Sequence, residues 1–244
     1  MIFAAGLGTR LRPLTDRMPK ALVPIHGKPL LLWQIERLKN AGIDRIIVNV
    51  HHKAEQIIRY LKENGNFGCD ILVSDETDRL LDTGGGLRKA LIQYPSDEPT
   101  LALNADILST DIITLLTTAY KGCDNPLVLL VVSSRTTKRY LAFDDAMRLK
   151  GWTNTDTGEI RPAGACLRGA KLLAFSGMQI VSPRIMTWMD RMEEDRFSLI
   201  DLYMYIIANG GDVRAYIPTD YQMMDVGKIE QLNEAEQWAE QWLM

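Results

Sequence analysis

MIFAAGLGTRLRPLT, residues 1–15, and MPKALVPI, residues 18–25, decide the fold of this chain. A short apolar strand is predicted up to Ala4, and it opens into a loop with two glycines and two arginines. Glycines let backbone N–H groups approach phosphate oxygens, and concave runs of such groups bind anions. Arginine offers phosphate a planar fork and lysine a point charge. The stretch therefore predicts a strand followed by a polyphosphate-binding loop.

Two well-known phosphate loops do not fit this stretch. The dinucleotide fingerprint requires G-x-G-x-x-G, but Gly6 and Gly8 are followed by T-R-L without a third glycine. The P-loop pattern G-x-x-x-x-G-K-S/T is also missing. An ordinary glycine turn would not require Arg10, Arg12 and Lys20 within fifteen residues of Gly6. A dinucleotide-dependent oxidoreductase is therefore disfavoured, and a different phosphate-binding class is indicated.

Size and charge set further bounds. A chain of 244 residues suits one large domain or two intimate halves, and 46% hydrophobic residues are enough for an ordinary globular core. The net charge is −3, from 28 basic and 31 acidic residues. Nucleic-acid binders and proteins of anionic membranes usually carry a strong basic excess. We therefore expect neither nucleic acid nor a membrane as a partner.

The cysteines and the apolar runs predict a cytoplasmic protein. Cys69, Cys123 and Cys166 are widely spaced, which is typical of reduced thiols rather than of a disulfide framework or a zinc site. No run approaches 18 apolar residues, and the first five residues are too short for a signal sequence. Only four residues precede the loop, so we expect Met1 to be an internal methionine of a longer strand.

The first hundred residues alternate predicted strands and helices. Leu31, Ile35 and Leu38 mark an amphipathic helix that ends at Gly42. Further elements are a strand at 45–50, a helix around 57–61, a strand at 70–74 and a buried strand at 100–104. This order is typical of a parallel, doubly wound sheet. His51 and the next histidine follow a strand with diverging side chains, so polar loop roles are favoured over metal binding.

The second half contains more strands and fewer helices. We predict strands at 126–132, 175–181 and 213–217 and a hairpin formed by 139–144 and 147–152. Helices are predicted at 183–195 and 199–208. A last helix should bury Leu232, Ala235, Ala239 and Trp242 on one face.

A-A-G-x-G-T-R-L-x-P-L-T followed by P-K-x-L-x-P-I resembles the signature of the sugar-1-phosphate nucleotidyltransferases. Three later stretches resemble the same family: D-T-G-G-G at 82–86, an apolar strand ending in N-A-D at 104–106, and F-S-G at 175–177. The resemblance implies an α/β, Rossmann-like fold whose doubly wound central sheet is mostly parallel, with a smaller sugar-binding insertion. It implies one domain over 1–244, with a nucleotide-binding half at about 1–105 and a sugar-binding half at about 106–244.

The resemblance also implies a role for each matching residue. Arg10 should lie over the leaving pyrophosphate, and Lys20 should hold the α-phosphate and the sugar phosphate. Asp106 and Asp225, the latter in a D-V-G stretch, should converge on one Mg²⁺ ion, which prefers few carboxylates together with phosphate oxygens and waters. The nucleotide-binding residues would be Ala4, Ala5, Gly6, Gly8, Thr9, Thr83, Gly84 and Gly85. The sugar-binding residues would be Asn104, Ser176 and Gly177.

Several positions depart from the family pattern or stay open. Asp82 stands where glutamate is common, and Ser198 where close relatives often carry lysine. Arg12 could assist the phosphate contacts or could equally lie at the surface or behind the site, and the role of Asp201 is open. Taken alone, the triple glycine favours a flexible turn before a helix at 87–94, whereas the resemblance implies close backbone approach to a flat base.

The implied reaction joins an NTP and a sugar 1-phosphate to give an NDP-sugar and pyrophosphate, with the sugar phosphate attacking the α-phosphorus in line. No protein nucleophile is required, because the attacking phosphate is already ionised. The muramate and mannose 1-phosphate branch is most similar, which predicts a uridylyl- or guanylyltransferase. Alternatives are a phosphocholine-type cytidylyltransferase, with an aromatic cage from Trp152 or Trp188, and a non-catalytic nucleotide-sugar-binding regulator.

Overall fold

A computed structural model describes residues 1–242, which fold as two compact units. Unit 1 contains Met1–Leu80, Leu103–Thr114 and the chain from Asp220 on, and unit 2 contains Leu81–Ala102 and Leu115–Thr219. The chain therefore leaves unit 1 and returns to it twice. The assignment of 1–105 to the nucleotide and 106–244 to the sugar concerns function and stays a prediction.

A parallel sheet forms the centre of unit 1. Its strands lie in the order β6 (Thr100–Asn104), β1 (Ile2–Phe3), β4 (Arg45–Val50) and β5 (Asp70–Asp75), and β6 contributes its last two residues to unit 1. Ile2 pairs with Val48 on one side and with Leu103 on the other. The run I-I-V-N-V in β4 is rich in the β-branched residues that pack well in a buried strand. The carboxyl ends of these strands therefore meet at one edge of the sheet, where the glycine loop begins.

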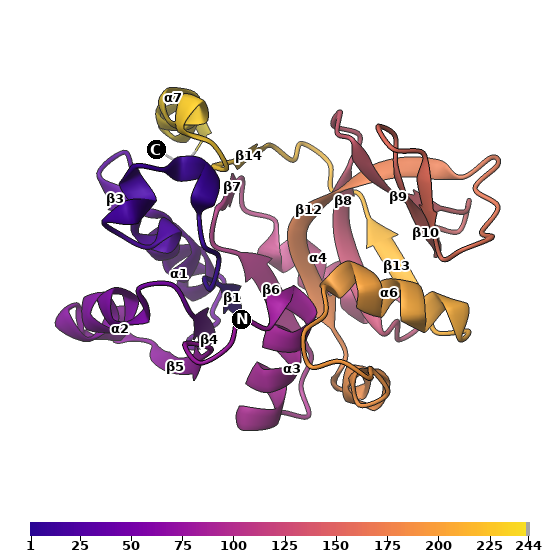
Figure 1. Cartoon of the computed structure of the whole chain (residues 1–244), viewed down its shortest axis with the longest axis horizontal. Helices are drawn as coiled ribbons and strands as arrows, with labels where there is room; N and C mark the ends of the chain where they lie inside the picture. The colour runs from indigo at the N-terminus through magenta and orange to yellow at the C-terminus, as the bar shows by residue number, and fades with distance from the viewer. Residues whose placement is uncertain (243–244) are drawn as a thin grey trace. The chain divides into compact units, whose positions relative to one another are not determined.

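Helices and two short strand pairs complete unit 1 (Figure 1). The helices are α1 (Leu30–Asn40), α2 (Ala54–Glu63) and α7 (Leu232–Trp242), and the strand pairs are β2 (Pro24–Ile25) with β3 (Lys28–Pro29) and β7 (Ile107–Ser109) with β14 (Met223–Asp225). Short 3₁₀ turns lie at Thr9–Leu11, Leu14–Asp16, Lys20–Leu22, Gly65–Gly68 and Ile229–Gln231. α7 packs beside β2 and β14.

One apolar cluster joins the glycine loop to these elements. Its buried members come from the loop, α1, the β7–β14 ribbon and α7: Leu11, Val23, Ile25, Leu30, Trp33, Leu108, Val226, Ala235 and Ala239. Full burial of a valine, leucine or isoleucine side chain stabilises a fold by about 1.5–3 kcal/mol. The loop and the ribbon therefore share one core, which fixes the polar residues that they carry.

Unit 2 is built on a mostly antiparallel sheet with the order β11 (Glu159–Arg161), β10 (Leu149–Asn154), β9 (Arg139–Phe143), β12 (Lys171–Val181), β8 (Val128–Ser133) and β13 (Val213–Tyr216). Only β13 runs parallel to its neighbour, β8. Its helices are α3 (Asp82–Gln93), α5 (Met186–Met189) and α6 (Leu199–Ala208), and a 3₁₀ turn at Pro183–Ile185 precedes α5. A further helix, α4 (Ile113–Gly122), begins at the last two residues of the second segment of unit 1 and continues in unit 2. α6 lies against β10 and β13 (Figure 1).

The α/β fold class, with a largely parallel sheet in unit 1, confirms the prediction. The strands at 45–50 and 100–104 and the helix at 199–208 have the predicted bounds. Three predictions were wrong in detail. The helix predicted at 87–94 begins at Asp82, the helix predicted at 183–195 ends at Met189, and Trp242 is 42% exposed rather than buried. No described helix combines the length and apolar character that a membrane crossing requires.

Candidate functional site

Gly8 is the point around which the N-terminal loop closes. Its φ is +63°, in the left-handed region that favours glycine. A Cβ there would lie 2.8 Å from Thr15 Cγ2 and 3.0 Å from Lys20 Cβ. The carbonyl of Gly8 accepts hydrogen bonds from the Leu11 amide (2.9 Å) and the Thr15 hydroxyl (2.8 Å). The loop is therefore folded back on itself, with Lys20 brought beside its glycine turn.

A buried polar chain fixes the start of the loop. The amide of Ala4 donates to Asn49 Oδ1 (2.7 Å), and Asn49 Nδ2 donates to Glu76 Oε1 (2.7 Å). Asn49 and Glu76 are 2% and 1% exposed. Ala4, predicted to bind nucleotide, thus donates its N–H within the protein. Sequence reasoning missed Asn49, although an asparagine in an apolar strand is a signal of a buried polar contact.

The two histidines hold backbone groups. His51 Nδ1 lies 2.7 Å from the carbonyl of Glu76, and His52 Nε2 lies 3.2 Å from the carbonyl of Thr15 in the loop. From α2, Gln56 Nε2 donates to the carbonyl of Arg17 (3.1 Å). The two histidine side chains contact different segments, in line with the predicted divergence. Gln56 links α2 to the backbone just after the glycine loop.

Lys20 and Asp106 form an ion pair, with Nζ donating to Oδ2. Their side chains are 12% and 28% exposed, so the pair is partly shielded from water. Arg12 instead pairs with Asp16 at 3.3 Å, with both side chains more than half exposed. Arg12 therefore lies at the surface, and an assisting role in catalysis stays a prediction.

Asp225 is brought to Asp106 by the β7–β14 ribbon. Asp225 lies opposite Ile107, the residue after Asp106, and the amide of Val226 donates to the carbonyl of Asp106 at 2.9 Å. The two aspartates, far apart in the sequence, therefore lie at one end of the same two-stranded ribbon.

Gly227 lies against both a carboxylate and a guanidinium. A Cβ on Gly227 would be 3.0 Å from Asp225 Oδ1 and 3.2 Å from Arg10 Nη2. Any other residue would therefore crowd both groups. Arg10, Lys20, Asp106 and Asp225, four residues predicted for catalysis and metal binding, are thus gathered in unit 1.

The donor set fits a divalent metal that is completed by its substrate. Among residues 1–242, no group of three or more histidine, cysteine, aspartate or glutamate side chains forms a metal-binding cluster. Asp106 and Asp225 supply carboxylate oxygens from one ribbon end, beside the small residue Gly227. Mg²⁺ is often bound by only one or two carboxylates together with waters and substrate phosphates. The pair fits such an ion.

The triple glycine lies in the first turn of α3, where the protein itself fills the space. The amides of Gly84 and Gly85 donate to the carbonyl of Phe197 (2.9 and 3.0 Å), and Thr83 Oγ1 accepts from the amide of Leu199 (3.0 Å). A Cβ on Gly84 would be 2.4 Å from the Phe197 ring, and one on Gly85 would be 2.2 Å from the Asp195 carbonyl oxygen. Close approach by residues 195–197 therefore explains these two glycines, and their nucleotide role stays a prediction.

Arg88 holds the same segment in place. It donates to the carbonyls of Met189 (3.2 Å) and Glu194 (3.2 Å) and to the carboxylate of Asp195 (2.8 Å), and its guanidinium lies 5.0 Å from the centre of the Phe197 ring. These contacts give the segment after α5 a non-helical course over α3. They explain why the helix predicted at 183–195 ends early.

Ser176 and Gly177 lie at an irregularity in β12. The pairing of β12 with β8 shifts between Phe175 and Gln179, and Gly177 has φ +70°. Ser176 is fully buried. Asn104, the third predicted sugar contact, ends β6 opposite Phe3 in unit 1. The sugar-binding roles of these three residues stay predictions.

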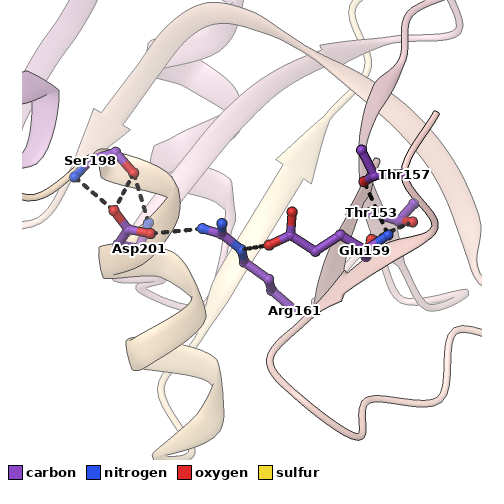
Figure 2. A network of polar contacts seen from close by, with 6 residues as sticks. All are labelled: Thr153, Thr157, Glu159, Arg161, Ser198 and Asp201. Atoms are coloured by element: carbon purple, nitrogen blue, oxygen red, sulfur yellow. Dashed lines mark hydrogen bonds and ion pairs between the residues drawn. The ribbon is translucent and has the colours of Figure 1, made fainter. Parts of the chain in front are cut away.

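Figure 2 shows the polar network around Asp201, formed by Thr153, Thr157, Glu159, Arg161, Ser198 and Asp201. Ser198 and Asp201 form a capping box at the start of α6: the Asp201 amide donates to Ser198 Oγ (3.1 Å) and the Ser198 amide to Asp201 Oδ2 (3.0 Å). Arg161 bridges Asp201 (3.0 Å) and Glu159 (2.6 Å). Ser198 and Asp201 thus have a structural role that joins α6 to β11.

Comparison with known proteins shows what the chain is similar to. The family model described as nucleotidyl transferase matches residues 1–140. The chain is 31% identical over 223 residues to an N-acetylmuramate α-1-phosphate uridylyltransferase of Caulobacter vibrioides, covering 86% of this chain and 84% of the relative. It is 40% identical over 109 residues to a mannose-1-phosphate guanylyltransferase catalytic subunit β of Drosophila melanogaster, covering 44% of this chain and 30% of that protein.

Solved structures support the fold independently of close sequence similarity. A putative glucose-1-phosphate thymidylyltransferase from Bacillus anthracis aligns with a TM-score of 0.79 at 15% identity, covering 98% of this chain and 93% of that one. Identity at this level supports the architecture alone. The two relatives agree with the branch that the sequence motifs resemble, and the solved structure agrees with the fold.

Proposed function

The chain belongs to the nucleotidyl transferase family, and on that premise we propose how it acts as a sugar-1-phosphate nucleotidyltransferase. It joins an NTP and a sugar 1-phosphate to give an NDP-sugar and pyrophosphate. The observation that carries the proposed mechanism is the gathering of Arg10, Lys20, Asp106 and Asp225 around the glycine loop and the β7–β14 ribbon.

The reaction is a displacement at phosphorus. An oxygen of the sugar phosphate forms a bond to the α-phosphorus of the NTP while the bond from that phosphorus to the bridging oxygen of the pyrophosphate breaks. The attacking oxygen is already ionised, so no protein group has to remove a proton. Catalysis then consists of positioning and of neutralising charge on the phosphates.

The cations of unit 1 supply this neutralisation. Arg10 is exposed at the outer end of the loop, next to Gly227, and we assign it to the leaving pyrophosphate. Lys20 lies beside the Gly8 turn, and we assign it to the α-phosphate and the sugar phosphate. The exposed Gly6 and Thr9 and the half-buried Gly8 offer backbone groups to the nucleotide, and the nucleotide role of the buried Ala5 stays a prediction.

Asp106 and Asp225 would hold Mg²⁺, which when bound would stabilise negative charge on the phosphates. Lys20 orients the carboxylate of Asp106 through their ion pair, and Gly227 leaves room beside the carboxylate of Asp225. Cytoplasm is the proposed compartment, because NTPs are made there and all three cysteines are unpaired.

UTP with N-acetylmuramate 1-phosphate, and GTP with mannose 1-phosphate, are the substrate pairs to test first. They correspond to the named activities of the two relatives above. The phosphocholine alternative needs a free aromatic cage. Arg161 lies over the Trp152 ring at 5.0 Å, and Trp188 packs edge-on against Tyr205. These contacts disfavour a choline cage built from either tryptophan.

A pyrophosphate-release assay distinguishes an enzyme from a non-catalytic regulator. The chain should be incubated with Mg²⁺, each of five NTPs and a panel of sugar 1-phosphates. We expect release only with one NTP and one or two closely related sugar phosphates. The Asp225→Asn variant is the matched control and should bind NTP but lose most turnover. NTP binding without pyrophosphate release from any pair would favour the regulator, and release from CTP with phosphocholine would favour the cytidylyltransferase.

A further inference from the structure

Two polar residues of α1 are buried where apolar side chains would be expected. Gln34 is 0% exposed and Arg37 8% exposed, among leucine and isoleucine positions of the same helix. Residues three apart on a helix are neighbours, and Arg37 Nη1 donates to Gln34 Oε1 at 3.0 Å. The two side chains therefore act as one connected pair.

The pair contacts the backbone of one short segment, β7 and its continuation. Gln34 Nε2 donates to the carbonyl of Ile107 at 2.9 Å, and Arg37 Nη2 lies 3.5 Å from the carbonyl of Thr110. Ile107 is the first residue of β7, and Thr110 follows its last residue. Gln34 and Arg37 thus hold β7 at both ends.

One end of β7 adjoins the predicted metal residue Asp106, and the other end is tied to the segment that leads into β14. Ile107 follows Asp106 and lies opposite Asp225. At the other end, the amide of Thr110 donates to the carbonyl of Gln222 (3.0 Å). Gln222 directly precedes β14. A shift of β7 relative to α1 would therefore move Asp106 directly and Asp225 through the ribbon.

Burying Arg37 has an energetic cost that simple packing would avoid. Burial lowers the pKa of its guanidinium, while Tyr221 and Asp111 oppose that shift. Its Nε, buried as well, has no hydrogen-bond partner among residues 1–242. Apolar replacements of a buried ionic group are often neutral or stabilising. The hydrogen bonds of the pair to the backbone of β7 and Thr110 give it a role that packing alone does not explain.

We propose that Gln34 and Arg37 are positioning residues that set the register of β7, and thereby the convergence of Asp106 and Asp225 on a divalent cation. This inference rests on the proposed function for the identity of the cation site, but not for substrate identity. Residues that orient metal ligands typically contribute about 10–100-fold to metal affinity.

The test measures Mn²⁺ binding by electron paramagnetic resonance, with UTP present and no sugar phosphate. Gln34→Met keeps the side-chain length and removes both hydrogen bonds. Gln34→Glu keeps the acceptor for Arg37 and loses the donor to Ile107. We expect each variant to bind Mn²⁺ about 10-fold more weakly, with UTP affinity in EDTA changed less than twofold. Hydrogen exchange at the amides of Thr110 and Val226 should accelerate in both.

A matched stability control separates positioning from packing. Ile57→Ala empties a fully buried position of α2 and should lower Tm while leaving Mn²⁺ affinity within twofold of wild type. Gln34 variants that lose stability but bind Mn²⁺ as the wild type does would overturn the proposal. Arg37→Met provides a second test, through Thr110, if a Gln34 variant fails to fold.

Failure of the proposed function has a different result. Suppose that Mn²⁺ binding depends on Asp225 but the wild type releases no pyrophosphate from any substrate pair. The proposed reaction is then rejected, and the Gln34 and Arg37 variants still test the positioning role through Mn²⁺ affinity. If the Asp225→Asn variant binds Mn²⁺ as tightly as the wild type does, the positioning role itself is rejected.

Discussion

The amide of Val226 donates a 2.9 Å hydrogen bond to the carbonyl of Asp106, so one backbone contact links the strand ends that carry Asp106 and Asp225. Neither aspartate lies on a long, regular strand. Each depends on the short β7–β14 ribbon, which is buried on one side by Leu108 and Val226. The candidate metal site is therefore made by a small ribbon anchored in a shared apolar core.

Asp225→Asn should keep the fold and lose most turnover. The amide is nearly isosteric, but it removes the charge that would balance a divalent cation. We expect kcat to fall by roughly 10²–10³, while thermal unfolding changes by little. Turnover measured against Mg²⁺ concentration checks this. Full activity in EDTA, in either protein, would contradict a metal role for Asp225.

Lys20→Ala should impair kcat far more than stability. The Lys20–Asp106 pair is partly exposed, and such pairs contribute about 0–1 kcal/mol to folding. A charge contact made mainly in the transition state contributes several times more, so kcat should fall roughly 100-fold or more. Steady-state kinetics and a melting curve on the same protein decide this. A variant with normal folding and wild-type turnover would remove Lys20 from the mechanism.

Gly227→Ala should disturb the site without straining the backbone. The added Cβ would lie 3.0 Å from Asp225 Oδ1 and 3.2 Å from Arg10 Nη2, so both groups must shift. We expect at least a tenfold loss of kcat/KM with a small change in Tm. Gly122→Ala, in open space at the end of α4, is the matched control and should leave kinetics unchanged. Equal kinetics for both variants would refute the crowding argument.

Gly84→Ala and Gly85→Ala should destabilise unit 2 to different extents. Each gains about 1 kcal/mol of helix propensity, but overpacking costs about 1–3 kcal/mol or more. Gly85 faces the backbone oxygen of Asp195, which cannot rotate away, so its variant should lose more stability. Phe197→Leu should partly relieve Gly84→Ala and not Gly85→Ala. Urea titrations of the single and double variants measure this, and strict additivity at Gly84 would contradict it.

Asn49→Asp should make stability depend on pH. A carboxylate at this position would face Glu76 Oε1, now 2.7 Å from Asn49 Nδ2, and two buried carboxylates repel. Sharing a proton raises the folded-state pKa of the pair above its unfolded value. The folded state then binds more protons, so stability falls as pH rises above about 5. Unfolding at pH 5 and pH 8, against wild type, should show a loss of roughly 2 kcal/mol that is larger at pH 8.

The strands and the glycine loop were predictable because their signals are local. β4 and β6 are short apolar runs bounded by polar residues, and the loop residues stand together in sequence. The capping box at Ser198 and Asp201 set the start of α6 at the predicted residue. In these segments local pattern and tertiary structure agree.

Contacts between distant segments account for what the sequence did not reveal. Arg88 fixes the carbonyls that follow α5, so a helix-like pattern at 190–195 does not continue as helix. The early start of α3 depends on the Phe197 carbonyl, more than a hundred residues away. Asn49 and the Gln34–Arg37 pair are polar residues inside apolar patterns, and only coordinates show which backbone groups they hold.

The return of the chain to unit 1 from Asp220 onward has a consequence for biosynthesis. During synthesis on the ribosome, β7 emerges long before its partner β14, and all of unit 2 is made in between. Until residues 223–242 appear, β7 has an unpaired edge, and Leu11 and Trp33 lack their neighbours from α7. A premature stop or proteolytic cut after Thr219 would therefore not merely trim a tail. It would remove Asp225 together with the strand that pairs with β7 and the helix that packs on the glycine loop.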